Sequence, residues 1–250
     1  MNFFSINAFI KGLILLCRPH LYLFWLRHLT KTISNTIELS KWISKQEKHN
    51  TYNDFYSPLR DYQKRYKLYE YVVDRQGLKN EPFEYLEFGV CQGASFRWWM
   101  EHCIHPQSRF FGFDTFEGLP EKWGVFDKGD MSANIPLLSD NRGKFIKGLF
   151  QETLPSFLEQ VQLDTNKRKI IHLDADLFSS TLYALTSLAP YLKKGDILLF
   201  DEFNVPNHEF SAFKIFCDTY YFKTQLLAAV NNYYQVAMVI IDCPEKKKVF

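Results

Sequence analysis

A short apolar stretch that ends in an acid and two glycines does most to define what this chain can fold into. Residues 85–95 read Tyr-Leu-Glu-Phe-Gly-Val-Cys-Gln-Gly-Ala-Ser, the pattern of a strand, a tight turn and a helix start. Glycine allows such a turn and lets a ligand approach the backbone where a Cβ would block it. The helix that follows would direct free N–H groups and its positive dipole end at that ligand. Because Glu87 stands at the strand tip, a ligand with a cationic group is favoured over a dinucleotide pyrophosphate.

Strands and helices alternate from about residue 83 onward. Strands are expected at about 84–88, 110–113, 145–150, 169–173 and 197–200, and a final hairpin at 225–230 and 235–241. Helices are expected at about 59–73, 94–104, 154–162, 179–192 and 208–220, with Pro155 near the start of the third and Ser179, Ser180 or Thr181 capping the fourth. This order predicts an α/β fold with a doubly wound, mostly parallel sheet of seven strands, whose crevices open at the carboxyl ends of the strands.

The first 54 residues differ in composition from the rest. We expect a helical N-terminal extension over residues 1–54 and the α/β domain over residues 55–250. Residues 1–30 are very apolar, but cations such as Lys11, Arg18 and Arg27 interrupt them. The uncharged runs fall short of the roughly 20 residues that a membrane-spanning helix needs. Two interpretations remain: helices packed on the domain or on a second subunit of a homo-oligomer, or helices lying in a membrane interface.

Overall composition excludes several classes of protein. The net charge of +2 gives no field that would attract nucleic acid. The five cysteines are scattered without a C-x-x-C pair, which indicates reduced thiols in a cytoplasmic protein, rather than a disulfide framework or a zinc site. If the N-terminus contacts a membrane, the location is the inner membrane surface. Aromatic residues make up 17% of the chain, and we expect most of them in the core.

An acid follows the second expected strand. Asp114 closes that strand about 20 residues after Gly93, where nucleotide-binding folds of this class place the acid that holds the ribose hydroxyls. A carboxylate suits a vicinal diol because it accepts two hydrogen bonds. The alternative is an ordinary turn residue at a strand end.

Acids also follow the fourth and fifth expected strands. Asp174 and Asp176 follow one strand, and Asp201 and Glu202 follow the other. Carboxylates crowded in one crevice repel each other unless a cation lies among them, and their oxygens suit Mg²⁺, Ca²⁺ or Mn²⁺. Such a cation can lower the pKa of a bound hydroxyl. The alternatives are separate solvated carboxylates, or a phosphatase of the haloacid-dehalogenase type, for which Phe178 is the wrong residue.

Five motifs in order extend these observations. They are Tyr85-Leu-Glu-Phe-Gly-Val-x-x-Gly93, Gly112-Phe-Asp-Thr-Phe-Glu-Gly-Leu-Pro120, Gly148-Leu-Phe-x-Glu-Thr-Leu-Pro155, Leu173-Asp-Ala-Asp-Leu-Phe-x-Ser-Thr181 and Gly195-Asp-x-x-Leu-x-Asp-Glu-Phe203. Over residues 60–240 the chain thereby resembles the macrocin O-methyltransferase family, whose members use S-adenosylmethionine (SAM) and Mg²⁺ to methylate sugar hydroxyls. The first motif is similar to their SAM loop, with Cys91 in place of a frequent middle glycine.

The resemblance assigns roles to individual residues. Cofactor binding falls on Glu87, Gly89, Gly93 and Asp114, and from their positions we also expect Thr115, next to Asp114, and Glu152, after the third strand, to contact the cofactor. Metal binding falls on Asp176, Asp201 and Glu202, where the family usually has two aspartates at the last pair. Asp176 is also the candidate general base, and His208 is the second candidate for a catalytic role.

The sequence therefore predicts a SAM- and metal-dependent O-methyltransferase whose substrate is a small molecule or glycan bearing a sugar hydroxyl. The long irregular stretch 115–142, which carries Trp123 and Phe126, is the expected lid. The competing hypothesis is a non-catalytic protein of the same fold, docked to a membrane or to a partner in polysaccharide assembly. An NAD(P) oxidoreductase is disfavoured because no G-x-G-x-x-G motif is present.

Overall fold

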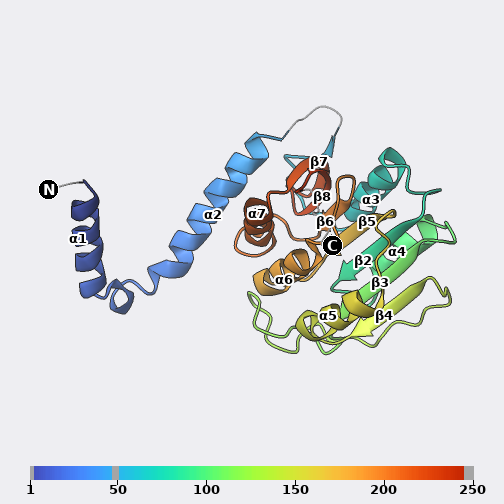
Figure 1. Ribbon diagram of the computed structural model, residues 1–250, viewed down its shortest axis with the longest axis horizontal. Helices are drawn as coiled ribbons and strands as arrows, with labels where there is room; N and C mark the ends of the chain where they lie inside the picture. Colours follow the sequence, from blue (N-terminus) through green and yellow to red (C-terminus); the bar gives the residue numbers. More distant parts are fainter. Residues whose placement is uncertain (1–2, 47–50, 245–250) are drawn as a thin grey trace, which may run out of the picture. The chain divides into compact units, whose positions relative to one another are not determined.

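The computed structural model describes residues 3–46 and 51–244, which fall into two compact units (Figure 1). Unit 1 comprises residues 1–44 and unit 2 comprises residues 45–250. The division lies at 44/45 rather than at the expected 54/55. The reason is that the short strand β1 (Tyr52–Asn53) pairs with the sheet of unit 2.

Unit 1 is helical, as the sequence predicts. It contains α1 (Phe3–Leu16), a short 3₁₀ turn (Pro19–Leu21) and α2 (Leu26–Ser44). The break between the helices follows from Arg18, which adopts a left-handed φ of 49°, and from Pro19, which cannot continue a hydrogen-bonded helix. Among the described residues, no single helix has the length and apolar character needed to cross a bilayer. Residues Ile6–Leu21 and Leu26–Ser44 reach that length only together, as a pair bent by 114°.

Unit 2 contains one mixed sheet of eight strands. The remaining strands are β2 (Phe83–Phe88), β3 (Arg109–Asp114), β4 (Gly143–Lys147), β5 (Arg168–Leu173), β6 (Ile197–Phe200), β7 (Lys223–Val230) and β8 (Gln235–Asp242). Their order is β1-β7-β8-β6-β5-β2-β3-β4. The pairs on either side of β8 are antiparallel and the other pairs are parallel. The mostly parallel sheet and its terminal hairpin are confirmed, but the strand number is eight and not seven.

Five helices cover the two faces of this sheet. They are α3 (Lys64–Arg75), α4 (Ala94–His102), α5 (Phe150–Gln160), α6 (Phe178–Leu188) and α7 (Glu209–Tyr220). Right-handed crossovers put α3 and α4 on one face, because the chain then moves toward β4, and α5, α6 and α7 on the other, because it moves toward β1. Figure 1 shows this doubly wound arrangement.

Two expected boundaries are wrong for local reasons. Helix α5 begins at Phe150 and contains Pro155, so the proline does not mark its start. Strand β4 accordingly ends at Lys147, and Gly148 turns the chain with a φ of 141°. Helix α6 begins at Phe178, and no side chain caps its first turn. The expected cap from Ser179, Ser180 or Thr181 is therefore absent from this helix.

Aromatic side chains fill the core on both faces. On the α3 and α4 face, Tyr69, Tyr85 and Trp99 are almost fully buried, and the Trp99 ring contacts both tyrosine rings. On the other face, Phe88 stacks on Phe113 with ring centroids 4.9 Å apart. The interpretation of most aromatic residues as core is confirmed. Their bulk holds the parallel strands rigid beneath the loops at the carboxyl ends.

Candidate functional site

The carboxyl ends of the central strands lie level with each other. Gly89, Asp174 and Asp201 are each the first residue after their strands, and their amides still hydrogen-bond to the neighbouring strand at 2.9, 2.9 and 3.0 Å. Asp114, on the other side of β2, is the last residue of β3. Because the side chains follow directly from these paired positions, the sheet itself brings the loop glycine and the acids to one edge.

A cavity of about 410 Å³ opens at this edge. Its volume lies within the range of small-molecule sites. Residues from almost every loop at the carboxyl ends line it, namely Arg60, Tyr62, Arg65, Gly89, Cys91, Asp114, Thr115, Gly118, Leu119, Pro120, Trp123, Phe126, Met131, Leu149, Phe150, Gln151, Asp174, Ala175, Asp176, Ser180, Asp201, Glu202 and Tyr234. Seven residues given a role from the sequence lie on this wall: Gly89, Asp114, Thr115, Asp174, Asp176, Asp201 and Glu202.

The glycines of the loop are needed mainly for packing within the protein. Gly89 has a φ of 96°, and a Cβ added there would lie 1.8 Å from the carbonyl oxygen of Asp174. At Gly93, with a φ of 71°, the added Cβ would approach Pro136 at 3.1 Å, and this glycine does not line the cavity. Cys91, where the related loops often have glycine, also has a positive φ, of 48°. The backbone demands these conformations whether or not a ligand is bound.

Asp114 holds the same loop in place. Its Oδ2 accepts hydrogen bonds from the amides of Val90 at 2.8 Å and Cys91 at 2.7 Å, and its Oδ1 accepts one from the amide of Phe116 at 2.7 Å. A carboxylate oxygen accepts more than one hydrogen bond, so ligand hydroxyls can still be bound. The neighbouring Thr115 donates its hydroxyl proton to the carbonyl of Gly118 at 2.9 Å.

Glu87 lies below the loop and not on the cavity wall. It has no exposed surface and accepts hydrogen bonds from the Tyr85 hydroxyl at 2.6 Å and the Ser95 hydroxyl at 2.5 Å. Burial raises the pKa of its carboxyl to about 7, although these two donors and the Arg65 guanidinium oppose the rise. Its predicted contact with a cofactor is therefore indirect in this geometry, through the loop and α4.

A buried histidine continues this polar network. The Tyr85 hydroxyl lies 2.6 Å from Nδ1 of His172, and the Tyr69 hydroxyl lies 3.3 Å from its Nε2. Burial lowers the pKa of His172 to about 3, so its ring is neutral. When Tyr85 donates its one proton to Glu87, Nδ1 must carry the imidazole proton and donate to Tyr85, while Nε2 accepts from Tyr69. These partners fix the strands under the cavity.

The acids at the ends of β5 and β6 occupy one part of the wall. Burial raises the pKa of Asp176 to about 6 and that of Glu202 to about 8, and the charge of Asp201 adds to both increases. The pKa of Asp174 is also raised well above its usual value, by burial and by the charges of Asp201 and Asp176. Asp176 also has a left-handed φ of 57°, a strained conformation of the kind found at functional sites.

Two oxygens of this cluster are buried without a hydrogen-bond donor. They are Oδ1 of Asp201 and Oε2 of Glu202. The Arg65 guanidinium pairs with this cluster, and its Nη1 lies 3.8 Å from Oδ2 of Asp201. Over residues 3–46 and 51–244, however, no group of three or more His, Cys, Asp or Glu side chains has the arrangement of a metal site. The donor chemistry suits a hard cation, and the predicted metal site remains a prediction.

Two further candidate residues lie off the cavity wall. His208 precedes α7 and is half-buried, and it does not line the cavity. Glu152 is exposed in the first turn of α5, whereas the preceding Gln151 lines the cavity. Helix α5 starts earlier than the sequence pattern suggested, which shifts the wall residues of this loop to positions 149–151.

Sequence reasoning missed a part of the cavity wall that consists of basic and aromatic side chains. The Arg60 guanidinium lies 3.4 Å from the Tyr234 ring centre and 4.6 Å from that of Tyr62. The Tyr234 hydroxyl in turn donates a hydrogen bond to Oε1 of Glu202. Arg65 lies within the helix expected at about 59–73, but no pattern pointed to Arg60 or Tyr234.

The irregular stretch 115–142 forms another side of the cavity. Trp123 and Phe126 line it with their rings stacked at 5.5 Å and 11°, and their backbones exchange two hydrogen bonds of 3.0 and 2.8 Å. These contacts give the loop a small ordered tip of apolar rings. Its proposed motion as a lid stays a prediction.

Comparison with known proteins agrees with this geometry. Residues 86–203 match the family model described as a methyltransferase domain. A curated relative, the 8-demethyl-8-(2,3-dimethoxy-alpha-L-rhamnosyl)-tetracenomycin-C 4'-O-methyltransferase of Streptomyces olivaceus, is 27% identical over 166 residues. That match covers 57% of this chain and 61% of the relative, so the two align over about three fifths of the relative's length.

Solved structures share the fold. CalS11, a calicheamicin methyltransferase, has a TM-score of 0.56 at 22% identity, covering 83% of this chain and 91% of its own. The O-methyltransferase NovP has a TM-score of 0.53 at 18% identity, covering 72% of this chain and 79% of its own. Unit 2 thus has the α/β fold of SAM methyltransferases, and the match over residues 86–203 includes the loop after β2, the acid that ends β3 and the acids after β5 and β6.

Proposed function

We propose that this chain is a SAM-dependent O-methyltransferase that acts on a sugar hydroxyl. The observation that carries the proposal is the single cavity wall that joins the loop after β2, Asp114 and the acids after β5 and β6. Support for a sugar acceptor comes from the curated relative, which is named as methylating a rhamnosyl group. The resemblance to macrocin O-methyltransferases noted in the sequence points the same way.

In this proposal the chain binds SAM at the loop side of the cavity. Asp114 accepts hydrogen bonds from the ribose hydroxyls, and the loop that contains Gly89 orients the methionine part. Trp123 and Phe126 cover the site and exclude water. The acceptor lies between the loop that carries Trp123 and the acids after β5 and β6, beside Arg60 and Tyr234.

Asp176 accepts the proton that the reaction releases. The hydroxyl oxygen attacks the methyl carbon of SAM, the C–O bond forms as the C–S bond breaks, and S-adenosylhomocysteine leaves. With a pKa of about 6, Asp176 is ionised near pH 7.5 and is still basic enough to take the hydroxyl proton.

A divalent cation completes the proposal. Asp176, Asp201 and Glu202 would hold the cation. Asp201 and Glu202 each have a buried oxygen that accepts no hydrogen bond and could bind the cation instead. When bound, such a cation polarises the acceptor hydroxyl and lowers its pKa.

Calorimetric titration with S-adenosylhomocysteine, and Mn²⁺ titration followed by electron paramagnetic resonance, test the two parts separately. We expect micromolar binding of S-adenosylhomocysteine, and Mn²⁺ binding that falls at least about tenfold in Asp201→Asn. Asp127→Asn is the matched control, because Asp127 is an exposed carboxylate outside the cluster. If S-adenosylhomocysteine does not bind, the methyltransferase proposal fails and the non-catalytic alternative is favoured. If only Mn²⁺ fails to bind, the metal leaves the mechanism and the methyltransferase remains.

A further inference from the structure

The segment 3–37 has a one-sided charge. It contains Lys11, Arg18, Arg27 and Lys31 but no aspartate or glutamate; the first acid along the chain is Glu38. The whole chain, in contrast, has almost equal numbers of acidic and basic residues, 28 against 30. The positive charge of this segment is therefore not a consequence of overall composition.

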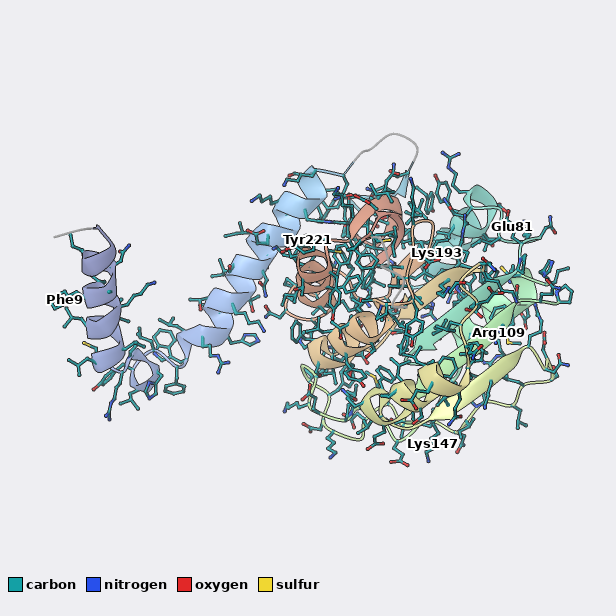
Figure 2. The ribbon with its side chains drawn as sticks, in the orientation of Figure 1. Phe9, Glu81, Arg109, Lys147, Lys193 and Tyr221 are labelled. Carbon is teal, nitrogen blue, oxygen red and sulfur yellow. The ribbon has the colours of Figure 1, made fainter. Side chains whose placement is uncertain are left out.

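Apolar side chains are exposed around helix α1. Phe9, Ile14 and Leu15 have exposed fractions of 61%, 53% and 74%, and their spacing places them on different sides of the helix. Figure 2 shows the sticks standing out from several sides of this helix, with Phe9 labelled. At about 1.5 Å per residue, its 14 residues extend roughly 21 Å, which is shorter than the core of a bilayer.

Aromatic side chains gather where the two helices meet. Tyr22, Phe24 and Trp25 are exposed in the short connection before α2. The Trp25 indole N–H donates a hydrogen bond to the carbonyl of Tyr22 at 3.1 Å. An indole with this internal partner can enter a less polar environment at little cost. Tryptophan and tyrosine favour the boundary between lipid headgroups and hydrocarbon.

The first turns of α2 are amphipathic. Leu29, Ile33 and Ile37 form an exposed apolar stripe at helical spacing, while Arg27 and Lys31 lie on another side of the helix. Hydroxyls near this stripe are bonded within the helix: those of Thr30, Thr32 and Thr36 each donate to the carbonyl four residues earlier at 2.8–2.9 Å. Such hydroxyls bring little desolvation cost when the helix enters an apolar surface.

We propose that residues 3–37 bind to the surface of a bilayer that contains anionic lipids. The apolar side chains enter the boundary of the hydrocarbon, and the four cations contact lipid phosphates. Charge decides between this partner and a second copy of the chain. Two copies would bring together segments that carry cations and no acids, whereas an anionic bilayer neutralises them. The inference does not depend on the proposed methyl transfer.

Flotation of the full chain with vesicles tests this surface. We expect binding to vesicles of 70% phosphatidylcholine and 30% phosphatidylglycerol to be at least about tenfold tighter than to pure phosphatidylcholine, and to weaken at 0.5 M NaCl. The double variant R27E/K31E should lose on the order of tenfold in affinity for the anionic vesicles. The matched control K122E/K128E changes the same charges on an exposed loop of unit 2 and should bind as the wild type does.

Depth of insertion gives an independent reading. Brominated lipids should quench part of the tryptophan fluorescence, and the Trp25→Phe variant should lose that part. Equal binding to both kinds of vesicle, or binding to neither, overturns the proposal. So does a lipid-free dimer, detected by sedimentation velocity, that R27E/K31E strengthens and vesicles do not dissociate.

Discussion

At the scale of single residues, the direction of a side chain decides its role more than its position in a motif. Glu87 stands near the tip of β2 and was expected to face a ligand. Side chains alternate across a strand, and Glu87 points to the face that α4 covers, where Ser95 hydrogen-bonds to it. Its carboxyl is thus part of the support beneath the loop.

The raised pKa of Glu87 should be visible in stability. Its folded-state pKa of about 7 exceeds the unfolded value of 4.5, so the folded protein keeps this proton over a range in which the unfolded chain has lost it. The contribution is fully present below pH 4.5 and is lost as pH rises through about 7. Relative to Glu87→Gln, the wild-type free energy of unfolding should fall by roughly 3 kcal/mol between pH 4.5 and 8 in urea titrations.

An exposed glutamate serves as the control for the effect of a Glu→Gln substitution itself on the pH dependence of stability. Glu70→Gln makes the same change on the exposed side of α3, and its difference from the wild type should stay constant with pH. A constant difference for Glu87→Gln as well would show that its carboxyl titrates normally in the folded protein.

At the scale of elements, the turn between β7 and β8 organises the wall that the sequence did not reveal. Asn231, Asn232 and Tyr233 all have left-handed φ values of 55–63°. Asn232 exchanges two hydrogen bonds with the backbone of Ser57, at 2.8 and 2.7 Å, and Asn231 exchanges two with that of Asp61, both at 2.9 Å. The turn therefore fastens the segment that carries Arg60 and Tyr62.

Removing one of these side chains should release that segment. In Asn232→Gly the left-handed backbone is retained and both bonds to Ser57 are lost, so amide exchange at Ser57 should accelerate about tenfold or more. Asn232→Ala adds backbone strain and should lower the free energy of unfolding by a further 1 kcal/mol or so. Unchanged exchange at Ser57 in the glycine variant would mean that other contacts hold the segment.

Long elements were predictable because their patterns repeat within a few residues. The central strands β2, β3, β5 and β6 lie within about two residues of expectation, since each is a continuous apolar run. Strand β1 has two residues, too few to form a pattern. The acids of the site could be placed because parallel strands end at a common edge. Arg60 and Tyr234 could not, since their meeting depends on a contact across most of the chain.

At the scale of the whole molecule, the two units differ in how their side chains are covered. Leu39 is the one buried apolar residue among the described positions of unit 1, whereas the core of unit 2 runs continuously from α3 to β8. A helix of 14 residues without packing is marginally stable in water. We therefore expect cooperative unfolding of unit 2 and local, non-cooperative unfolding of α1.

Amide hydrogen exchange should be fast in unit 1 and slow in the core of unit 2. Without lipid, amides of α1 should show protection factors below about 10², and central amides of β2, β5 and β6 above about 10⁴, because the latter open only by global unfolding. Exchange–mass spectrometry with and without anionic vesicles measures both units at once. Strong protection of α1 in the absence of lipid would indicate that the helix is covered by protein.

The three hydrogen bonds that backbone amides donate to Asp114 have a consequence for the kinetics of ligand binding. If Asp114 binds ribose hydroxyls as proposed, its carboxylate, already hydrogen-bonded to its own loop, needs no rearrangement when they bind, so little conformational entropy is lost on association. Nucleoside entry should then proceed in one kinetic phase, with a rate that rises linearly with concentration. The Asp114→Asn variant should bind the nucleoside both more slowly and more weakly, because its loop would first have to adopt the binding conformation.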